Sequence, residues 1–539
     1  MPIEVPEPAA DDAAGGSAPS ADARLAGREG AALAAVTWGA PLAVAAIVVA
    51  NAWAGLMPGV GFWDTGEFQT VLPILGTAHP TGYPTYVLLG FVANILLAPI
   101  GEPAFRITVL SLLAVAAAAG LTVALARRLT HSLPIAVAAG IGLALTPLVW
   151  ANATRADPHP IHLAFVALLL FTLVSWEQRR RRRAPDADRW LVASALVFGL
   201  AAGNHSLTLL LAPPIALYVL VTEPRIVLRP KLIAACAAVL VASVVLVYLE
   251  LPLRAGPFRA PLVYARPDTW DGFWYVALAE QFRGSLSDPL GDLPAKFGDV
   301  AELAWAQFGL LTPIIVAGFL ATIRRAPRYA LLTGTAMVVT LVFNTSYANA
   351  DIERYYLGPI LWAWTWLAVL AAFLVDLVAL LVPKKAADPP ARWLTAGVAA
   401  VLAIAMLVPV VSMSTRSRLQ ADRSGDRGAE VWLDQALAAV AQNAVVVSWW
   451  STSTVLWYGT KVEGLRPDIA IVDDRTMLDE DLGGAGDVVG RYLGVRPVYI
   501  IRANGHDLGL ILQEFVIRQV AGEGNEALYE VTGRSGAAE

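Results

Sequence analysis

The sequence predicts an all-α polytopic membrane protein of about eleven transmembrane helices, followed by a small C-terminal α/β domain. Three observations lead to this fold class. Hydrophobic residues make up 57% of the 539 residues and charged residues 15%, against about 25% charged in soluble domains. Several apolar runs approach the ~20 residues that cross a hydrocarbon core. The basic residues are also unevenly spread along the chain, although the net charge is −5.

Composition and motif content exclude or disfavour several classes of function. Cys236 is the only cysteine and lies in an apolar run, so a secreted disulfide scaffold is excluded. A net charge of −5 does not suit a nucleic-acid-binding protein. Neither GxxxxGK[ST] nor a GxGxxG that follows a strand occurs, which disfavours a nucleotide-sugar donor.

The chain divides into a tail, a membrane region and a C-terminal domain. Residues 1–30 are rich in Ala, Pro, Gly, Ser and Asp, and we expect them to form a disordered cytoplasmic tail. The transmembrane domain should occupy 31–413 and begin with an uncleaved anchor, because no compact basic region precedes its first apolar run. The expected spans are 33–53, 106–126, 133–150, 161–176, 190–205, 206–222, 232–250, 303–322, 329–345, 356–382 and 393–413.

One further apolar run, at 82–99, decides the topology. If it does not cross the membrane and the N-terminus is cytoplasmic, the cytoplasmic loops receive most of the basic residues, as membrane proteins prefer. Those residues are Arg127, Arg128, the arginines at 179–183, Arg189, Arg225, Arg229, Lys231, Arg324, Arg325, Arg328, Lys384, Lys385 and Arg392. We therefore expect 82–99 to be a juxtamembrane or re-entrant helix on the outer side of the plasma or inner membrane. The arginine run sets topology and can also attract anionic lipid headgroups.

The chain from 414 to 539 is predicted to be an extracytoplasmic α/β domain. Short apolar runs at 444–450, 468–474 and 496–503 are bounded by turn signals and are typical of strands. A segment with helical spacing, STSTVLWYGTKVEGL, lies between the first two runs.

Charged residues near membrane depth are costly and mark candidate sites. In the first outward loop, Asp64 and Glu67 follow the first span, three residues apart. Asp64 can serve as a general base, with Glu67 as a second acid or orienting group. The alternative is a purely structural role for Asp64 as the N-cap of a helix. In the same loop, His79 lies in the HPTGYP turn, where an imidazole can meet an anionic or hydroxylated ligand.

These two motifs resemble the first outer loop of GT-C-fold glycosyltransferases, multi-pass enzymes that use polyprenyl-phosphate sugars. The stretches DTGE (64–67) and HPTGYP (79–84) are similar to Asp-x-Gly-Glu and His-Pro-x-Gly-Tyr-Pro motifs of a protein O-mannosyltransferase-like family. The resemblance covers roughly 50–380 and implies a GT-C-like catalytic domain with a re-entrant first loop. It also implies that His79 and Tyr83 contact substrate.

The second outward loop, WANATRADPHPIH, carries Arg155, Asp157, His159 and His162. GT-C enzymes often have a second acidic motif here, so the resemblance makes Asp157 a candidate, with Arg155 and His159 as substrate contacts. The sequence departs from the family, which more often has Glu-Val-Tyr. A polar loop cap and a metal site are the alternatives. Asn204 and His205, at another outer span end, are either buried structural groups or part of the site.

Two more outward segments supply arginines. Arg254 follows a span, near Arg259, Arg266 and several aromatic residues, and arginine forms bidentate contacts to phosphate. Interfacial anchoring explains the aromatic residues equally well. In the segment 344–359, the resemblance implies that Arg354 holds a lipid-linked phosphate, with Asp351 and Tyr355 also contacting substrate. A local ion pair of Arg354 with Asp351 or Glu353 is the competing interpretation.

The expected function is a glycosyltransferase that moves a sugar, mannose by analogy, from a polyprenyl phosphate to an acceptor hydroxyl on the outer face of the membrane. Asp64 would accept the hydroxyl proton in a single inverting displacement. Arg354 and Arg254 would neutralise the phosphate, while Glu67 and His79 would position the reacting groups. The scheme requires no cofactor or metal. Its partners would be the lipid-linked donor, a protein, glycan or lipid acceptor, and membrane lipids, but no nucleic acid.

Two other functions stay open. A transporter or lipid flippase for envelope-polymer precursors would also place acids and arginines within the membrane. Paired half-repeats are not evident, however, and the polar residues concentrate at outer span ends. The other alternative is a non-catalytic relative whose outer tail serves in the assembly of surface polymers.

Overall fold

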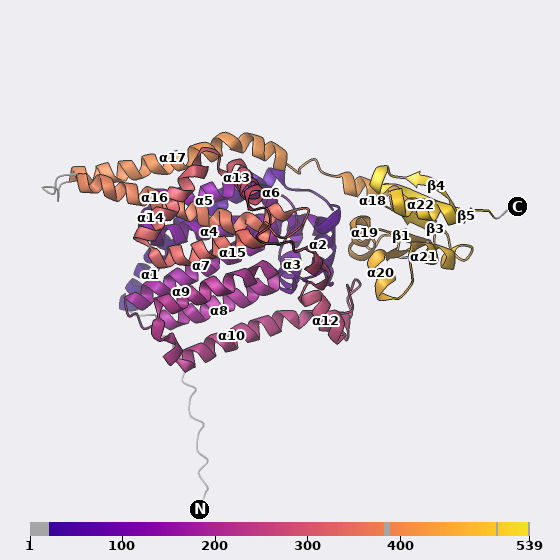
Figure 1. Ribbon diagram of the computed structural model, residues 1–539, viewed down its shortest axis with the longest axis horizontal. Coiled ribbons are helices and arrows are strands. Elements are labelled where there is room, and N and C mark those ends of the chain that lie inside the picture. Colours follow the sequence, from indigo (N-terminus) through magenta and orange to yellow (C-terminus); the bar gives the residue numbers. More distant parts are fainter. Residues whose placement is uncertain (1–20, 382–388, 503–504, 537–539) are drawn as a thin grey trace, which may run out of the picture.

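The computed structural model describes residues 21–381, 389–502 and 505–536. Figure 1 shows a bundle of long helices with a smaller domain at one end, which contains the sheet and the C-terminus. Part of the predicted disordered tail, 1–20, lies outside the described residues, as do Lys384 and Lys385. The rest of that tail, 21–30, is the beginning of a helix, because its alanine, leucine and arginine residues favour helix formation.

The membrane part is predominantly helical in its predicted spans. Its helices are α1 (Ala21–Ala52), α2 (Trp63–Ile74), α3 (Pro84–Leu96), α4 (Pro103–Thr130), α5 (Leu133–Leu145), α6 (Pro147–Ala153), α7 (His159–Arg181), α8 (Ala187–Asn204), α9 (Ala212–Thr222), α10 (Pro230–Tyr248), α11 (Glu250–Ala255), α12 (Trp270–Ala277), α13 (Leu293–Phe308), α14 (Thr312–Arg325), α15 (Pro327–Asn344), α16 (Leu357–Leu381) and α17 (Pro389–Ala421).

Among the described residues, seven helical segments are long and apolar enough to cross a membrane, and α5 with α6 makes an eighth if the bent pair counts as one span. The other three predicted spans form α8, the η3 turn (Ser206–Leu211) with α9, and α15, all within the same bundle. These three do not reach the same combination of length and apolarity. The expectation of about eleven spans therefore reduces to seven or eight by this criterion.

The span predicted at 133–150 is broken rather than continuous. Helices α5 and α6 meet at an angle of 65° around Thr146. Proline disfavours a helical conformation in the residue before it, and Thr146 precedes Pro147 with an extended backbone. The Thr146 hydroxyl donates to the Gly142 carbonyl at 2.9 Å and accepts from Trp364 Nε1 at 2.9 Å, so its polar groups are satisfied within the bundle.

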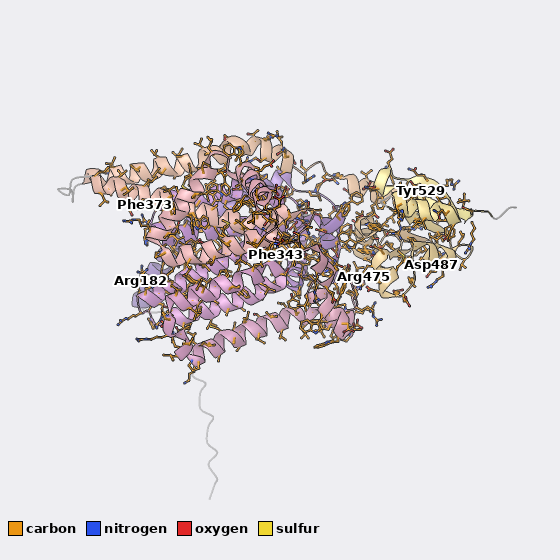
Figure 2. The ribbon with its side chains drawn as sticks, viewed as in Figure 1. Arg182, Phe343, Phe373, Arg475, Asp487 and Tyr529 are labelled. Carbon is orange, nitrogen blue, oxygen red and sulfur yellow. The ribbon has the colours of Figure 1, made fainter. Side chains whose placement is uncertain are left out.

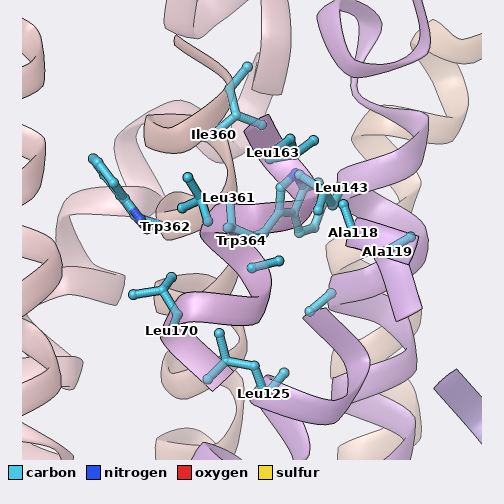
Figure 3. Packing of buried hydrophobic residues seen from close by; sticks show 14 of the residues in the cluster. Ala118, Ala119, Leu125, Leu143, Leu163, Leu170, Ile360, Leu361, Trp362 and Trp364 are labelled. Atoms are coloured by element: carbon cyan, nitrogen blue, oxygen red, sulfur yellow. The ribbon is translucent and has the colours of Figure 1, made fainter. Parts of the chain in front are cut away.

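Close packing of small and large residues holds the bundle core together. In a membrane, helices associate largely through such packing, because lipid tails are as apolar as the side chains. Helix α4 carries the run Ala116, Ala118, Ala119 and Gly120, and a Cβ at Gly120 would lie 2.8 Å from the Pro41 carbonyl oxygen of α1. Figure 3 shows Trp364 of α16 packed beside Leu143 and Ala118 in this core.

The two ends of the bundle differ in charge. The end that meets the C-terminal domain, here called the domain end, carries α2 and α3. The opposite end, here called the arginine end, carries Arg182, far from the domain in Figure 2. Ion pairs cross-link this end between helices: Arg180 with Glu223, Arg229 with Asp188, Arg325 with Asp376 and Arg328 with Glu177. The described basic residues that were predicted to share one side of the membrane therefore do gather at one end.

The chain between α1 and α4 begins and returns at the domain end, so the segment at 82–99 does not cross the bundle. Its helix α3 has 13 residues, about 20 Å at 1.5 Å per residue, which is less than a hydrocarbon core of about 30 Å. The prediction of a juxtamembrane or re-entrant first loop is confirmed.

The C-terminal domain contains a five-stranded sheet in the order β2-β1-β3-β5-β4. Its elements are α18 (Gly428–Ala439), β1 (Val445–Ser448), α19 (Trp450–Trp457), a π-helical turn η8 (Tyr458–Val462), β2 (Ala470–Asp473), α20 (Asp474–Asp479), α21 (Ala485–Tyr492), β3 (Val498–Ile501), α22 (Gly505–Glu514), β4 (Phe515–Ala521) and β5 (Leu528–Arg534). Strands β2, β1 and β3 are parallel, with Val446 opposite Ile471 and Tyr499. Strands β4 and β5 form an antiparallel edge.

The α/β class and its first three strands are confirmed, with two corrections. The predicted boundary at 414 lies inside α17, which continues to Ala421, because residues 414–421 prolong the apolar helix without a breaker. Strands β4 and β5 were not predicted; both are partly exposed, and polar residues, Arg518 and Gln519 in β4 and Glu530 in β5, interrupt their apolar residues.

We predict that Gly142→Ala destabilises the bundle by about 1–3 kcal/mol, the usual range for overpacking a core. An added Cβ would lie 2.3 Å from Cη2 of Trp364, a ring that is itself buried. Thermal unfolding in detergent measures the effect. Gly397→Ala in α17 is the matched control, since a Cβ there meets nothing within 4 Å. Equal melting temperatures for the two variants would contradict the prediction.

Candidate active site

Helix α2 presents the first acidic pair at the domain end. It begins at Trp63, and its N-cap Phe62 makes no side-chain cap. Asp64 is therefore in the first turn and not the N-cap, which removes the structural alternative proposed for it. Gly66 allows close approach on this helix, because a Cβ there would lie 2.1 Å from the Gly61 carbonyl oxygen and 3.0 Å from Thr454 Oγ1 of the C-terminal domain.

Arg354 is the centre of the charged cluster. Its Nη1 donates to Asp157 Oδ2 at 2.7 Å, and its Nη2 donates to Asp64 Oδ2 at 3.2 Å and Asp351 Oδ2 at 2.7 Å. The four residues, which we call the Arg354 cage, come from α2, the 154–158 loop and the segment that precedes α16. The local ion pair with Asp351 is thus present, but Arg354 also joins both acidic loop motifs. The planar fork of arginine suits such multiple carboxylate contacts.

The carboxylates of the cage differ in accessibility. The side chain of Asp157 is 2% exposed, whereas that of Asp64 is 33% exposed. Asp157 also accepts from the backbone N–H of His159 at 2.8 Å and from its Nδ1 at 2.6 Å. Burial opposes its charge, but His159 and Arg354 together outweigh burial and hold the pKa of Asp157 well below its usual range. Asp64 and Asp351, whose side chain is 55% exposed, are consequently the cage carboxylates that a reactant can reach, and Asp64 is the one beside Glu67 on α2.

The HPTGYP turn forms a second polar unit with Glu67. His79 donates through its backbone N–H to Glu67 Oε1 at 2.8 Å, and its Nδ1 donates to Glu67 Oε2. The Tyr83 hydroxyl lies 3.3 Å from Nε2 of His79. Burial lowers the pKa of His79, but Glu67, with a further contribution from Asp64, raises it above the usual value. Gly82 has φ +75°, and a Cβ there would lie 2.8 Å from Val276, so this turn requires glycine.

Aromatic and imidazole rings lie beneath the cage. The ring centroids of His159 and His205 are 4.6 Å apart, and Tyr355 lies 5.2 Å from His159. Nε2 of His159 and Nε2 of His205 are buried with no protein partner. Unsatisfied buried polar atoms are costly, so these two nitrogens are candidates for binding substrate hydroxyls. His205 was predicted either as a satisfied core residue or as a site residue, and its geometry favours the site.

The structure places two predicted arginines differently from expectation. Arg254 donates through Nε to the Leu75 carbonyl at 2.8 Å and through Nη2 to the Ile74 carbonyl at 3.1 Å. It therefore caps the C-terminus of α2 in place of the expected phosphate contact. Arg354 likewise has both terminal nitrogens on carboxylates, so we assign it a positioning role. Arg155 stays near the cage, with its Nε 4.0 Å from Asp157 Oδ2.

Two cavities flank these groups. The larger, of about 480 Å³, lies between the membrane part and the C-terminal domain and is lined by Glu67, Thr77, Tyr264 and Trp457, and by Arg259, Arg266, Asp473, Arg475, Thr476, Asp479, Glu480 and Asp481. The smaller, of about 170 Å³, is lined by three arginines, Arg155, Arg354 and Arg423, with Asp351 and Glu353 among its other residues. The first can hold a small organic group and the second a single phosphate.

The contribution of the C-terminal domain was not predicted. Figure 2 shows Arg475 where this domain meets the bundle. Its guanidinium pairs with Asp479 and lies 4.9 Å from the ring centroid of Tyr264, and Asp479 accepts from the Ala265 N–H at 2.9 Å. One available signal was the DDR sequence (473–475), which begins at the last residue of β2, because ligands of parallel sheets gather at the carboxyl ends of strands.

The residues do not favour a metal site. Within the described part of the chain, no group of three or more His, Cys, Asp or Glu side chains could hold a metal ion. Of the residues that such a site would use, Asp157 and His159 bond to each other, and Asp157 also bonds to Arg354. The third, His162, has its Nδ1 3.4 Å from the Thr208 hydroxyl.

Comparison with known proteins agrees with this geometry. Residues 64–227, which include both acidic loop motifs and continue past α9, match a sequence model described as the Protein O-mannosyl-transferase TMEM260 N-terminal domain. The Protein O-mannosyl-transferase TMEM260 of Mus musculus is 26% identical over 438 residues, which cover 77% of this chain. The chain spans 60% of the length of that relative. The resemblance that the two first-loop motifs predicted is confirmed.

Solved structures extend the likeness in fold to more than nine tenths of the chain. ArnT from Cupriavidus metallidurans bound to undecaprenyl phosphate superposes with a TM-score of 0.56 at 16% identity, over 91% of this chain and 97% of that chain. This chain has the GT-C fold. The archaeal oligosaccharyltransferase AglB from Archaeoglobus fulgidus, in complex with an inhibitory peptide and a dolichol-phosphate, gives a TM-score of 0.51 at 12% identity, over 93% of this chain and 74% of that chain.

We predict that the pair formed by His79 and Glu67 makes stability depend on pH. Because the folded-state pKa of His79 is above the ordinary value of 6.5, the pair stabilises fully below that value and less as pH rises through the folded-state pKa. The melting temperature of the parent protein should exceed that of His79→Asn most at about pH 6 and least at about pH 9. His131→Asn, at an exposed histidine, should show no such trend. A constant difference for His79→Asn would refute this interpretation.

We also predict strong coupling within the Arg354 cage. Arg354→Gln should cost about 3–5 kcal/mol of unfolding free energy, because it leaves the buried Asp157 without its cation. In an Asp157→Asn background, the same change should cost less by about 1–3 kcal/mol. The exposed pair of Arg518 and Glu530 is the control, with an expected coupling under about 1 kcal/mol. Additive costs for Arg354 and Asp157 would show that the cage does not act as a unit.

Proposed function

We propose that this protein is a membrane glycosyltransferase that transfers a sugar from a polyprenyl-phosphate donor to an acceptor hydroxyl. The observation that carries the proposal is the Arg354 cage, in which one buried cation orients an accessible carboxylate, Asp64, beside a second polar unit of Glu67 and His79. Such convergent polar groups with perturbed pKa values at cavity walls are typical of active sites. The donor class is supported by ArnT and AglB, whose structures contain undecaprenyl phosphate and dolichol-phosphate.

The reaction that fits these groups is a single displacement with inversion. Asp64 accepts the proton of the acceptor hydroxyl while that oxygen bonds to the anomeric carbon of the sugar. The bond between this carbon and the phosphate oxygen breaks, and the polyprenyl phosphate leaves with the bonding electrons. Arg354 holds Asp64 in place through the bond from its Nη2 to Oδ2, which fixes the orientation that a general base needs.

The negative charge of the departing phosphate is stabilised best by cationic groups that are already in position before the reaction. We place this phosphate in the smaller cavity, which is lined by Arg155, Arg423 and Arg354. The acceptor then approaches through the larger cavity, whose wall contains Glu67. His159 and His205, with their unpartnered nitrogens, are placed to contact sugar hydroxyls.

The finer assignments follow from the relatives and from charge. Mannose as the sugar and a protein hydroxyl as the acceptor are favoured by the name of the mouse relative, a protein O-mannosyl-transferase. The arginine end is assigned to the cytoplasmic side of the plasma or inner membrane by the positive-inside rule. The active site and the C-terminal domain then lie on the outer side.

We predict that Asp64→Asn folds but transfers sugar about 10²–10⁴-fold more slowly, the usual contribution of a general base. Transfer from a synthetic polyprenyl-phosphate mannose to an acceptor polypeptide or glycolipid, followed by mass spectrometry, measures this rate in purified protein. Asp271→Asn, at an exposed position of α12, controls for the loss of one carboxylate and should retain the parent rate. Near-normal turnover by Asp64→Asn would exclude Asp64 as the base.

A further inference from the structure

The arginine end contains a cavity of about 690 Å³ that the proposed reaction does not use. Its lining comes from the ends of α4, α7, α9, α14 and α15. The charged lining residues are Arg128, Arg181, Arg325, Arg328 and Glu177, with His131 at the exposed rim. The volume lies within the range of about 300–1,000 Å³ typical of ligand pockets.

Positive charge exceeds negative charge around this cavity. Glu177 is the one carboxylate in the lining; its Oε2 accepts from the Tyr218 hydroxyl at 3.0 Å and its Oε1 from Arg328 Nη1 at 3.3 Å. Arg325 pairs with Asp376 of α16, just outside the lining. Two carboxylates therefore face four guanidinium groups, and the excess cation charge is available to an anion.

Much of the remaining lining of the cavity is apolar. It includes Leu129, Val174, Val221, Pro327 and Leu331. Arginine forks bind phosphate oxygens, whereas these apolar side chains suit hydrocarbon. A ligand that satisfies both must join a phosphate directly to an apolar part, which a free phosphate or sugar phosphate does not do.

We propose that this cavity binds the headgroup of an anionic membrane phospholipid. The phosphate contacts the arginines, and the first part of the acyl chains contacts the apolar lining residues. The position supports this ligand, because the cavity opens at the ends of helices long enough to cross a membrane, where headgroups lie. Basic pockets between such helices are known to attract anionic lipids.

The test uses the full-length chain purified in detergent and titrated with dioctanoyl phosphatidylglycerol, with binding followed by native mass spectrometry and by the melting temperature. Dioctanoyl phosphatidylcholine and glycerol phosphate are titrated in parallel. We expect phosphatidylglycerol to bind and raise the melting temperature, and the other two to do so at least about tenfold more weakly. Raising the salt concentration should weaken the interaction.

The variant is Arg181→Gln with Arg325→Gln. Both side chains can be exchanged without leaving a buried charge unpaired. Glu177 loses its 3.8 Å contact with Arg181 but keeps Arg328 at 3.3 Å, and the partner of Arg325, Asp376, is 64% exposed. We expect this double variant to bind phosphatidylglycerol at least about tenfold more weakly. Arg182→Gln with Arg183→Gln removes the same charge from exposed neighbours outside the cavity and should bind as the parent does.

Three outcomes would overturn the proposal. If both double variants lost the same affinity for phosphatidylglycerol, the lipid would be attracted by the overall positive charge of this end and not by the cavity. Equal affinity for phosphatidylcholine would exclude recognition of the negative charge. Equal affinity for glycerol phosphate would indicate a soluble ligand. A lipid-free melting curve like that of the parent shows that each variant is folded. The measurement involves no sugar donor, so its result is independent of the proposed transferase activity.

Discussion

A single buried guanidinium organises the domain end of this protein. Arg354 bonds to carboxylates from the first loop, the second loop and its own segment, positions separated by up to 290 residues in the chain. Desolvating a cation is costly unless partners surround it, so each of the three segments is required to keep the others in place. The acidic motifs are therefore not independent sites but parts of one electrostatic unit.

The C-terminal domain completes that unit by close approach. Gly66 lets α2 lie against Thr454 of α19, and the Tyr458 hydroxyl accepts from the Ala104 N–H at 3.2 Å at the beginning of α4. The Trp450 ring lies 5.7 Å from that of His79. These contacts place the carboxyl ends of β1 and β2 over the first loop and enclose the larger cavity. The reactive groups thereby sit in a partly dehydrated space, where electrostatic effects are stronger than in water.

The two ends of the bundle use the same residue types for different purposes. At the domain end, carboxylates outnumber the one arginine of the cage, and the arginine positions them. At the arginine end, guanidinium groups outnumber carboxylates, and ion pairs such as that of Arg180 with Glu223 tie neighbouring helices together. The excess of carboxylates suits the domain end to general-base chemistry, and the excess of guanidinium groups suits the arginine end to anion binding.

The sequence alone determined the membrane class and the presence of a small C-terminal α/β domain, and it singled out candidate residues that the structure brings together at the domain end. Apolar runs, and the preference of arginine for the cytoplasmic side of a membrane, depend only on the order of residues along the chain. They were therefore enough to predict that 82–99 does not cross the bundle and that the basic residues gather at one end. Asp64, Glu67, Asp157, Asp351 and Arg354 were found because charges near membrane depth are rare. One local signal gave a wrong prediction: the uninterrupted apolar run at 133–150 predicted a single continuous span, whereas the structure bends at Thr146.

Only the tertiary structure decided which of these groups meet. In the structure, Arg254 donates to carbonyls of α2 and Arg354 donates to three carboxylates, although both had been predicted from sequence context to contact phosphate. It also brought Arg475, Asp479 and Trp457 of the C-terminal domain to the wall of the cavity. Partners that lie hundreds of residues apart depend on helix packing and domain docking, and neither periodicity nor composition encodes those distances.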